Sequence, residues 1–153
     1  MLRQALFATV CTLSLMGAAS AATIHFEATL DGKNEVPPNS TNGSGQALAT
    51  LDTATKALSY TLTFQDLTGP AAAAHFHGPA APGANAGVAV PIGGKGMVSP
   101  VNGKATLTDA QMKDLEAGKW YVNVHTAANP GGEIRGQMKR AAADGHAAKP
   151  VKH

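Results

Sequence analysis

Two histidines separated by one residue are the part of this sequence best suited to chemistry. His75 and His77 flank Phe76, so in a β-strand both imidazoles project from one face and the phenyl ring from the other. Residues two apart on a strand can reach one metal ion, and neutral imidazole is a ligand for copper, zinc or nickel. The pair predicts one side of a metal site, although such a pair is also compatible with ordinary polar surface.

Two further histidines occupy positions of the same kind. His125 alternates with apolar residues in the segment 119–125, and His25 does so in the segment 23–30. Both imidazoles should therefore lie opposite an apolar face, and Tyr121 shares the face of His125. Three converging imidazoles would hold a metal ion without thiolates and leave one coordination position open. We expect a copper, zinc or other divalent ion to be held by His75, His77 and His125, with His25 as a reserve ligand.

The segment 129–137 combines a sharp Pro-Gly-Gly turn with two charged residues. Glu133 and Arg135 are two apart, so we expect a structural ion pair, with each other or with neighbouring strands, that fixes this turn. A catalytic interpretation would need a second carboxylate, for which Glu27 and Glu35 are candidates only by elimination. The sequence contains no nucleophile-elbow, zinc-protease or phosphate-loop motif, and predicts no catalytic residue.

Short apolar segments separated by Gly, Pro, Asn and Asp must position these side chains. The pattern predicts an all-β fold, an antiparallel Greek-key β-sandwich or barrel of about eight strands with one short helix. We expect strands over 23–30, 46–51, 57–64, 73–77, 88–92, 119–125 and 133–139.

Two local signals predict further elements. Asn102-Gly103 predicts a two-residue hairpin turn between the segments 97–98 and 105–107. Thr108, with Gln111 three residues later, predicts the capped start of a helix that turns Met112 and Leu115 inward and ends at Gly118.

The N-terminal segment has the form of a secretory signal peptide. A basic residue, a short apolar run and then small residues lead us to expect cleavage near residue 22, and a periplasmic or secreted protein. Cleavage would remove Cys11, the one cysteine, and leave a domain over 23–139 without disulfide or thiolate. The segment 140–153 lacks core residues and predicts a disordered tail.

Charge and composition exclude two classes of partner. Nucleic-acid binding needs a stripe of basic residues with aromatic rings that stack on bases. Here the net charge is only +2, the basic residues are scattered, and aromatic residues make up 5% of the chain. No segment after the signal peptide is long and apolar enough to predict a membrane span. The expected partners are a metal ion and, outside the cytoplasm, a protein.

Several motifs in order give the chain a resemblance to a known family. The motifs that carry the resemblance are Leu30-Asp31-Gly32, Asn34 to Pro38, Gly45 to Leu51, Ala74 to Gly78, Tyr121 to Thr126 and Pro130 to Gln137. With them the chain resembles the CHRD (chordin) domain, which would cover nearly all of the folded region. The resemblance implies an exported single-domain protein of the bacterial type. Because the chain has one domain, the growth-factor partner of animal chordins is not carried over.

A second, fainter likeness concerns the histidines. His75, His77 and the later His125 on a Greek-key scaffold are similar to the copper ligands of copper-zinc superoxide dismutase, although its cysteines and zinc ligands are missing. Three functions stay open: an exported metal-holding protein, a metal-free module that binds a protein or glycan, and metal-dependent superoxide chemistry. The first is the leading hypothesis, and an enzyme is less favoured.

Overall fold

The computed structural model describes residues 21–142. The alternation of apolar and polar residues produces nine strands, joined by one helix and one 3-10 turn. They are β1 (Thr23–Asp31), β2 (Ser44–Asp52), β3 (Ala57–Gln65), β4 (Ala71–His77), β5 (Val88–Gly93), β6 (Val101–Thr106), β7 (Tyr121–Thr126), β8 (Ile134–Gln137) and β9 (Lys139–Arg140), with η1 (Gly32–Asn34) and α1 (Asp109–Glu116).

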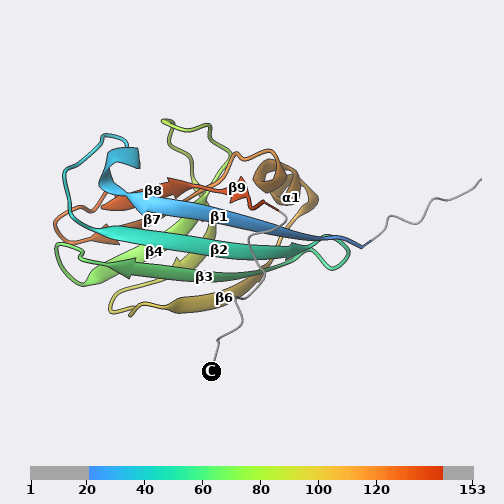
Figure 1. The fold of residues 1–153 in the computed structure, drawn as a ribbon, viewed down its shortest axis with the longest axis horizontal. Coiled ribbons are helices and arrows are strands. Elements are labelled where there is room, and N and C mark those ends of the chain that lie inside the picture. The colour runs from blue at the N-terminus through green and yellow to red at the C-terminus, as the bar shows by residue number, and fades with distance from the viewer. Residues whose placement is uncertain (1–20, 143–153) are drawn as a thin grey trace, which may run out of the picture.

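The strands form one antiparallel sheet that curls into a nearly closed barrel. Eight of them follow the order β5-β4-β7-β8-β1-β2-β3-β6, and β9 pairs with β1. The two end strands, β5 and β6, also contact each other. Figure 1 shows β1, β2, β3 and β6 side by side, with β8, β7 and β4 across the barrel. Because β8 returns to lie beside β1 of the β1-β2-β3 meander, the expected all-β Greek-key fold is confirmed.

The inner face of the barrel carries the apolar residues that the period-two pattern predicts. Phe26 of β1, Leu51 of β2, Leu58 of β3, Phe76 of β4 and Val122 of β7 are almost fully buried in one core cluster. Burial of side chains of this size stabilises a fold by roughly 1.5–3 kcal/mol each. The residues between them necessarily face outward, and this places the polar side chains of β4 and β7 on one outer surface.

The expected helix and its capping are confirmed. In α1 the Thr108 hydroxyl accepts from the Gln111 backbone N–H, and the Gln111 side chain accepts from the Thr108 N–H, which is a complete capping box. Leu115 is buried and Met112 is partly buried against the core. Gly118 follows the helix with φ of +70°, a left-handed conformation that glycine adopts at low cost.

The prediction of a hairpin turn at Asn102-Gly103 is wrong. Both residues lie inside β6, which pairs with β3 through partners that include Tyr60 and Gly103. A side chain at Gly103 would collide with the Tyr60 ring, so the glycine is explained by close packing across the strands. A contact with a distant strand therefore outweighs the local turn preference.

The expectations at the two ends of the chain concern residues that are only partly described. The signal peptide expected over 1–22 lies outside the described residues except for 21 and 22, and the tail does so from residue 143 onward. At the boundary, Arg140 belongs to β9, and the Ala141 N–H donates to the His25 carbonyl. Within 21–142, none of the helices has the length and hydropathy to cross a membrane.

Candidate metal centre

Adjacent strands bring three of the predicted histidines together. In the antiparallel pair β4–β7, His75 is opposite Asn123, His77 is opposite Tyr121, and Ala73 is opposite His125. One ligand atom from each of His75, His77 and His125 lies within 4.8 Å of the others. The shortest approach is 3.2 Å, between His75 Nδ1 and His125 Nε2. Strand pairing thus creates a cluster of three imidazoles on the outer face of the barrel.

Backbone carbonyls fix two of these rings. His77 Nδ1 lies 3.0 Å from the Ala86 carbonyl oxygen, and His125 Nδ1 lies 2.9 Å from that of Pro130. Because a carbonyl only accepts, each Nδ1 carries the proton. The Nε2 lone pair of His77 has no hydrogen-bond partner, whereas that of His125 faces His75 Nδ1 at 3.2 Å. An imidazole that donates one N–H to a carbonyl while the other nitrogen faces a common centre is the usual arrangement of a metal ligand.

The surroundings also keep the imidazoles of His75 and His77 uncharged. Burial, followed by the neighbouring His125 and His77, lowers the pKa of His75 below its ordinary value. Burial is also the largest cause of the lowered pKa of His77. Both rings are consequently in the neutral form that binds a metal at pH 7.

His25, the expected reserve ligand, is not part of this cluster. Its Nδ1 lies 3.1 Å from the Thr50 hydroxyl, on the pair β1–β2. Strand β8 separates β1 from β7 in the sheet order, so His25 and His125 lie on strands that are not neighbours.

Tyr121 lies between the histidine cluster and a buried arginine. Its ring is parallel to that of His77 on the β4 side, with centroids 4.8 Å apart. The Arg135 guanidinium carbon lies 3.4 Å from the centroid of the same ring, on the β8 side. Tyr121, which the sequence places on the same face as His125, is buried, with a relative exposure of 3%.

Arg135 holds the loop 78–87 over this face of the barrel. It donates to the Asn85 side-chain oxygen at 2.9 Å and to the Ala84 carbonyl at 2.5 Å. The backbone N–H of Ala86, the residue after Asn85 in this loop, donates to the Tyr121 hydroxyl oxygen at 3.2 Å. Since the Ala86 carbonyl fixes His77, the arginine positions this imidazole indirectly through the loop.

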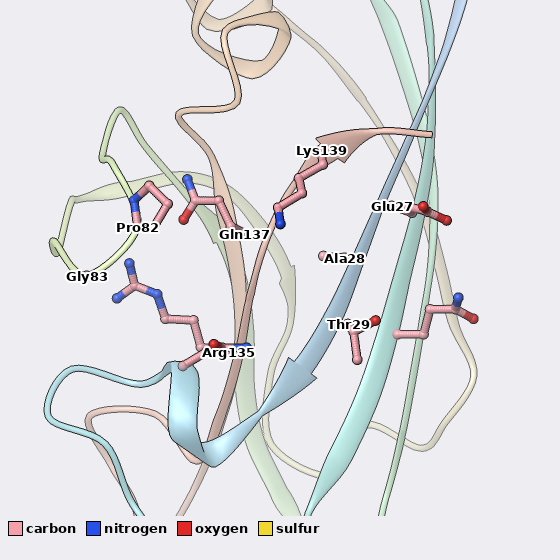
Figure 2. A pocket seen from close by; sticks show the side chains of 10 residues that line it. Glu27, Ala28, Thr29, Pro82, Gly83, Arg135, Gln137 and Lys139 are labelled. Atoms are coloured by element: carbon pink, nitrogen blue, oxygen red, sulfur yellow. The ribbon is translucent and has the colours of Figure 1, made fainter. Parts of the chain in front are cut away.

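A pocket of about 440 Å³ lies on the other side of Arg135. Figure 2 shows the Arg135 guanidinium directed toward Pro82 and Gly83, while Lys139 extends over the same space. Its described lining includes none of the three clustered histidines. Arg135 therefore lines this pocket and also lies against the Tyr121 ring.

Of the two expected pairings, the ion pair between Glu133 and Arg135 is wrong. The Glu133 carboxylate accepts four hydrogen bonds at 2.5–2.7 Å, from the hydroxyls of Thr41, Thr68 and Thr126 and from the Thr68 backbone N–H. Burial alone would raise the pKa of Glu133, but these hydrogen bonds outweigh it and hold the pKa at about 2. Neutral donors thus satisfy the carboxylate, which joins three segments of the chain.

Asn123 lies beside the histidine cluster and Glu35 lies beside Asn123, and neither position was predicted from the sequence. Both are buried, with relative exposures of 4% and 3%. Burial is the main cause that raises the pKa of Glu35 to about 7, against the lowering effect of Arg135. The period-two pattern could have identified Asn123, which shares a face with Tyr121 and His125, whereas no local pattern indicates the burial of Glu35.

Comparison with known proteins gives one match. The CHRD domain family matches residues 26–138, which is most of the chain. No curated protein and no solved structure matches the chain significantly.

Proposed function

The chain belongs to the CHRD domain family, and we propose that it is an exported binding module that holds one copper or other divalent metal ion through His75, His77 and His125. The observation that carries this proposal is the orientation of two imidazoles. His77 and His125 each donate Nδ1–H to a backbone carbonyl, which leaves each Nε2 lone pair on the side away from that contact. The lone pair of His77 has no hydrogen-bond partner, and that of His125 lies 3.2 Å from His75 Nδ1.

The chemistry of the cluster favours metals of the copper and zinc type. All three donors are neutral nitrogens, which suit copper, zinc and nickel better than the oxygen-seeking calcium or magnesium. Three imidazoles also leave a coordination position open, as in metal sites that exchange ligands. This arrangement supports storage, buffering or transfer of the ion.

A titration of the purified protein with copper and zinc, followed by calorimetry, tests the proposal. His146 and His153 are replaced by alanine throughout, because these two C-terminal histidines would otherwise add a second signal. We expect one ion per chain, and an affinity at least 100-fold lower in a His75→Ala/His77→Ala variant. His25→Ala, a histidine of the same barrel outside the cluster, is the matched control and should leave the affinity unchanged.

Other results would lead to the alternative functions. Weak binding that the double substitution leaves unchanged would contradict the metal proposal and favour a metal-free module that binds a protein or glycan. Turnover of superoxide by the metal-loaded protein, absent from the double variant, would instead identify an enzyme.

Export is tested separately by cell fractionation. The full chain should be recovered outside the cytoplasm and shortened at its N-terminus, whereas a chain lacking residues 2–22 should remain inside. Recovery of both forms in the cytoplasm at full length would contradict export and leave the metal proposal intact.

A further inference from the structure

Three buried polar atoms among residues 21–142 have no hydrogen-bond partner. They are Glu35 Oε1, His77 Nε2 and Asn123 Oδ1. Buried polar atoms are nearly always paired, so each exception needs an explanation. All three are acceptors when Glu35 is ionised, since His77 uses its Nδ1 proton for the Ala86 carbonyl. A donor or a cation is what would satisfy them.

The three atoms belong to one place in the fold. The Asn123 side chain approaches both the Glu35 carboxyl and the His77 imidazole closely enough to influence their protonation. On the sheet, Asn123 is opposite His75 and two residues from His125 on the same face of β7. The asparagine therefore lies at the base of the histidine cluster, with Glu35 beside it.

We propose that Asn123 and Glu35 hold a water molecule on the open coordination position of the metal. This inference rests on the proposed function. The metal would take the lone pair of His77 Nε2 and that of the water oxygen. The two O–H groups of the water would then donate to Asn123 Oδ1 and Glu35 Oε1. The metal and one bound water together thus supply a partner for each of the three unpaired atoms.

The backbone makes room for the carboxyl group. Gly132 lies against Glu35, and a Cβ atom at this glycine would overlap the carboxyl oxygens. The loop that contains Gly132 also contains Pro130, whose carbonyl fixes His125. The same loop therefore accommodates Glu35 and orients a metal ligand, which links the proposed water site to the metal site.

The two oxygen acceptors determine which ligands the open position prefers. Water and other neutral molecules with O–H or N–H groups can donate to both oxygens. A small anion such as azide cannot donate, and it would face two electron-rich oxygens in a buried setting. The site should hence select protic neutral ligands over anions.

Electron paramagnetic resonance of the copper(II)-loaded protein tests the inference. We expect ¹⁷O-enriched water to broaden the signal of the unsubstituted protein, because the labelled oxygen is bound to the copper. The variants Glu35→Gln and Asn123→Leu should retain copper, lose part of this broadening, and bind azide about tenfold more tightly than the unsubstituted protein. Asn102→Leu, the same substitution on the distant β6, is the matched control and should change neither readout.

The outcomes separate this inference from the proposed function. A protein that does not bind copper overturns both. Copper binding without ¹⁷O broadening overturns the water site alone. Broadening and azide affinity that both variants leave unchanged also overturn it, and would mean that Glu35 and Asn123 pair with each other in a purely structural role.

Discussion

The rings of His77 and Tyr121 stack face to face, with planes 4° apart and centroids separated by 4.8 Å. Because the Tyr121 hydroxyl also lies near the backbone nitrogen and carbonyl oxygen of Ala86, the same tyrosine supports the ring and the carbonyl that orients it. Tyr121 thus restrains His77 from two directions. In the proposed metal site, Tyr121 would therefore influence the binding of the ion without touching it.

Replacing Tyr121 tests this dual restraint. Tyr121→Leu removes the stacked ring and should lower the free energy of unfolding by about 2–3 kcal/mol and the copper affinity roughly tenfold. Tyr121→Phe keeps the stack and should cost only about 1 kcal/mol, with an affinity change under about threefold. Chemical denaturation and calorimetry measure the two quantities. Equal copper affinities for the two variants would mean that the ring does not restrain His77.

Arg135 is the next test, because it holds the loop 78–87 and lies against the Tyr121 ring. Arg135→Met removes the hydrogen bonds to Asn85 and Ala84 and should release this loop. We expect faster amide hydrogen exchange across the loop and a copper affinity lower by about tenfold.

Lys139→Met provides the control for the arginine, since Lys139 lines the same pocket and loses the same charge. It should change neither loop exchange nor copper affinity. A similar loss of affinity in both variants would indicate a general electrostatic effect and contradict the positioning role of Arg135.

The local elements of the fold could be predicted from the sequence, because their causes are local. Period-two alternation identifies the strands, and the Thr108–Gln111 capping box identifies the helix start. The prediction fails at Gly103, where the deciding contact is with Tyr60 on another strand. A sequence pattern reports local preference and cannot report which ring lies across the sheet.

The candidate site shows the same difference between local features, which the sequence predicts, and contacts between distant segments, which it does not. The spacing of His75 and His77 indicates a shared face, and alternation gives His125 its outward position. Their convergence depends on the pairing of β4 with β7, whose histidines are 50 residues apart along the chain. Because strand pairing cannot be read from local patterns, His25 was expected as a reserve ligand although it lies outside the cluster. For the same reason the sequence did not predict that threonines, and not Arg135, are the partners of Glu133.

The buried carboxyl of Glu35 predicts a specific dependence of stability on pH in the metal-free protein. The folded-state pKa of about 7 exceeds the ordinary 4.5, so the folded state retains the proton more strongly than the unfolded state. Below pH 4.5 Glu35 is protonated in both the folded and the unfolded state, so its ionisation does not lower the free energy of unfolding. As the pH rises from 4.5 to 7, ionisation of the buried carboxyl lowers the free energy of unfolding progressively, and above pH 7 this loss stays constant.

Glu35→Gln should therefore stabilise the metal-free protein at pH 8 by about 2 kcal/mol and have little effect at pH 4.5. Urea denaturation at both pH values measures the difference. Glu27→Gln, on the exposed side of β1, should change stability at neither pH. A stabilisation by Glu35→Gln that is equal at the two pH values would contradict an ionisation effect.

Glu133 should show the opposite dependence. Its folded-state pKa of about 2 is below the ordinary 4.5, since four hydrogen bonds favour the ionised form despite burial. The carboxylate accordingly stabilises the fold above pH 4.5, and this contribution is lost as pH falls from 4.5 to 2. Glu133→Gln should lower the free energy of unfolding at pH 7 by about 2–3 kcal/mol.

The loss caused by Glu133→Gln should shrink as the pH approaches 2, because the native glutamate then becomes neutral as well. Thr68→Val removes one hydroxyl donor but leaves the backbone N–H in place, so it should reproduce about a third of the loss at pH 7. Urea denaturation between pH 7 and pH 2.5 follows both variants. A destabilisation by Glu133→Gln that stays constant over this range would show that shape, and not charge, is what the three threonines recognise.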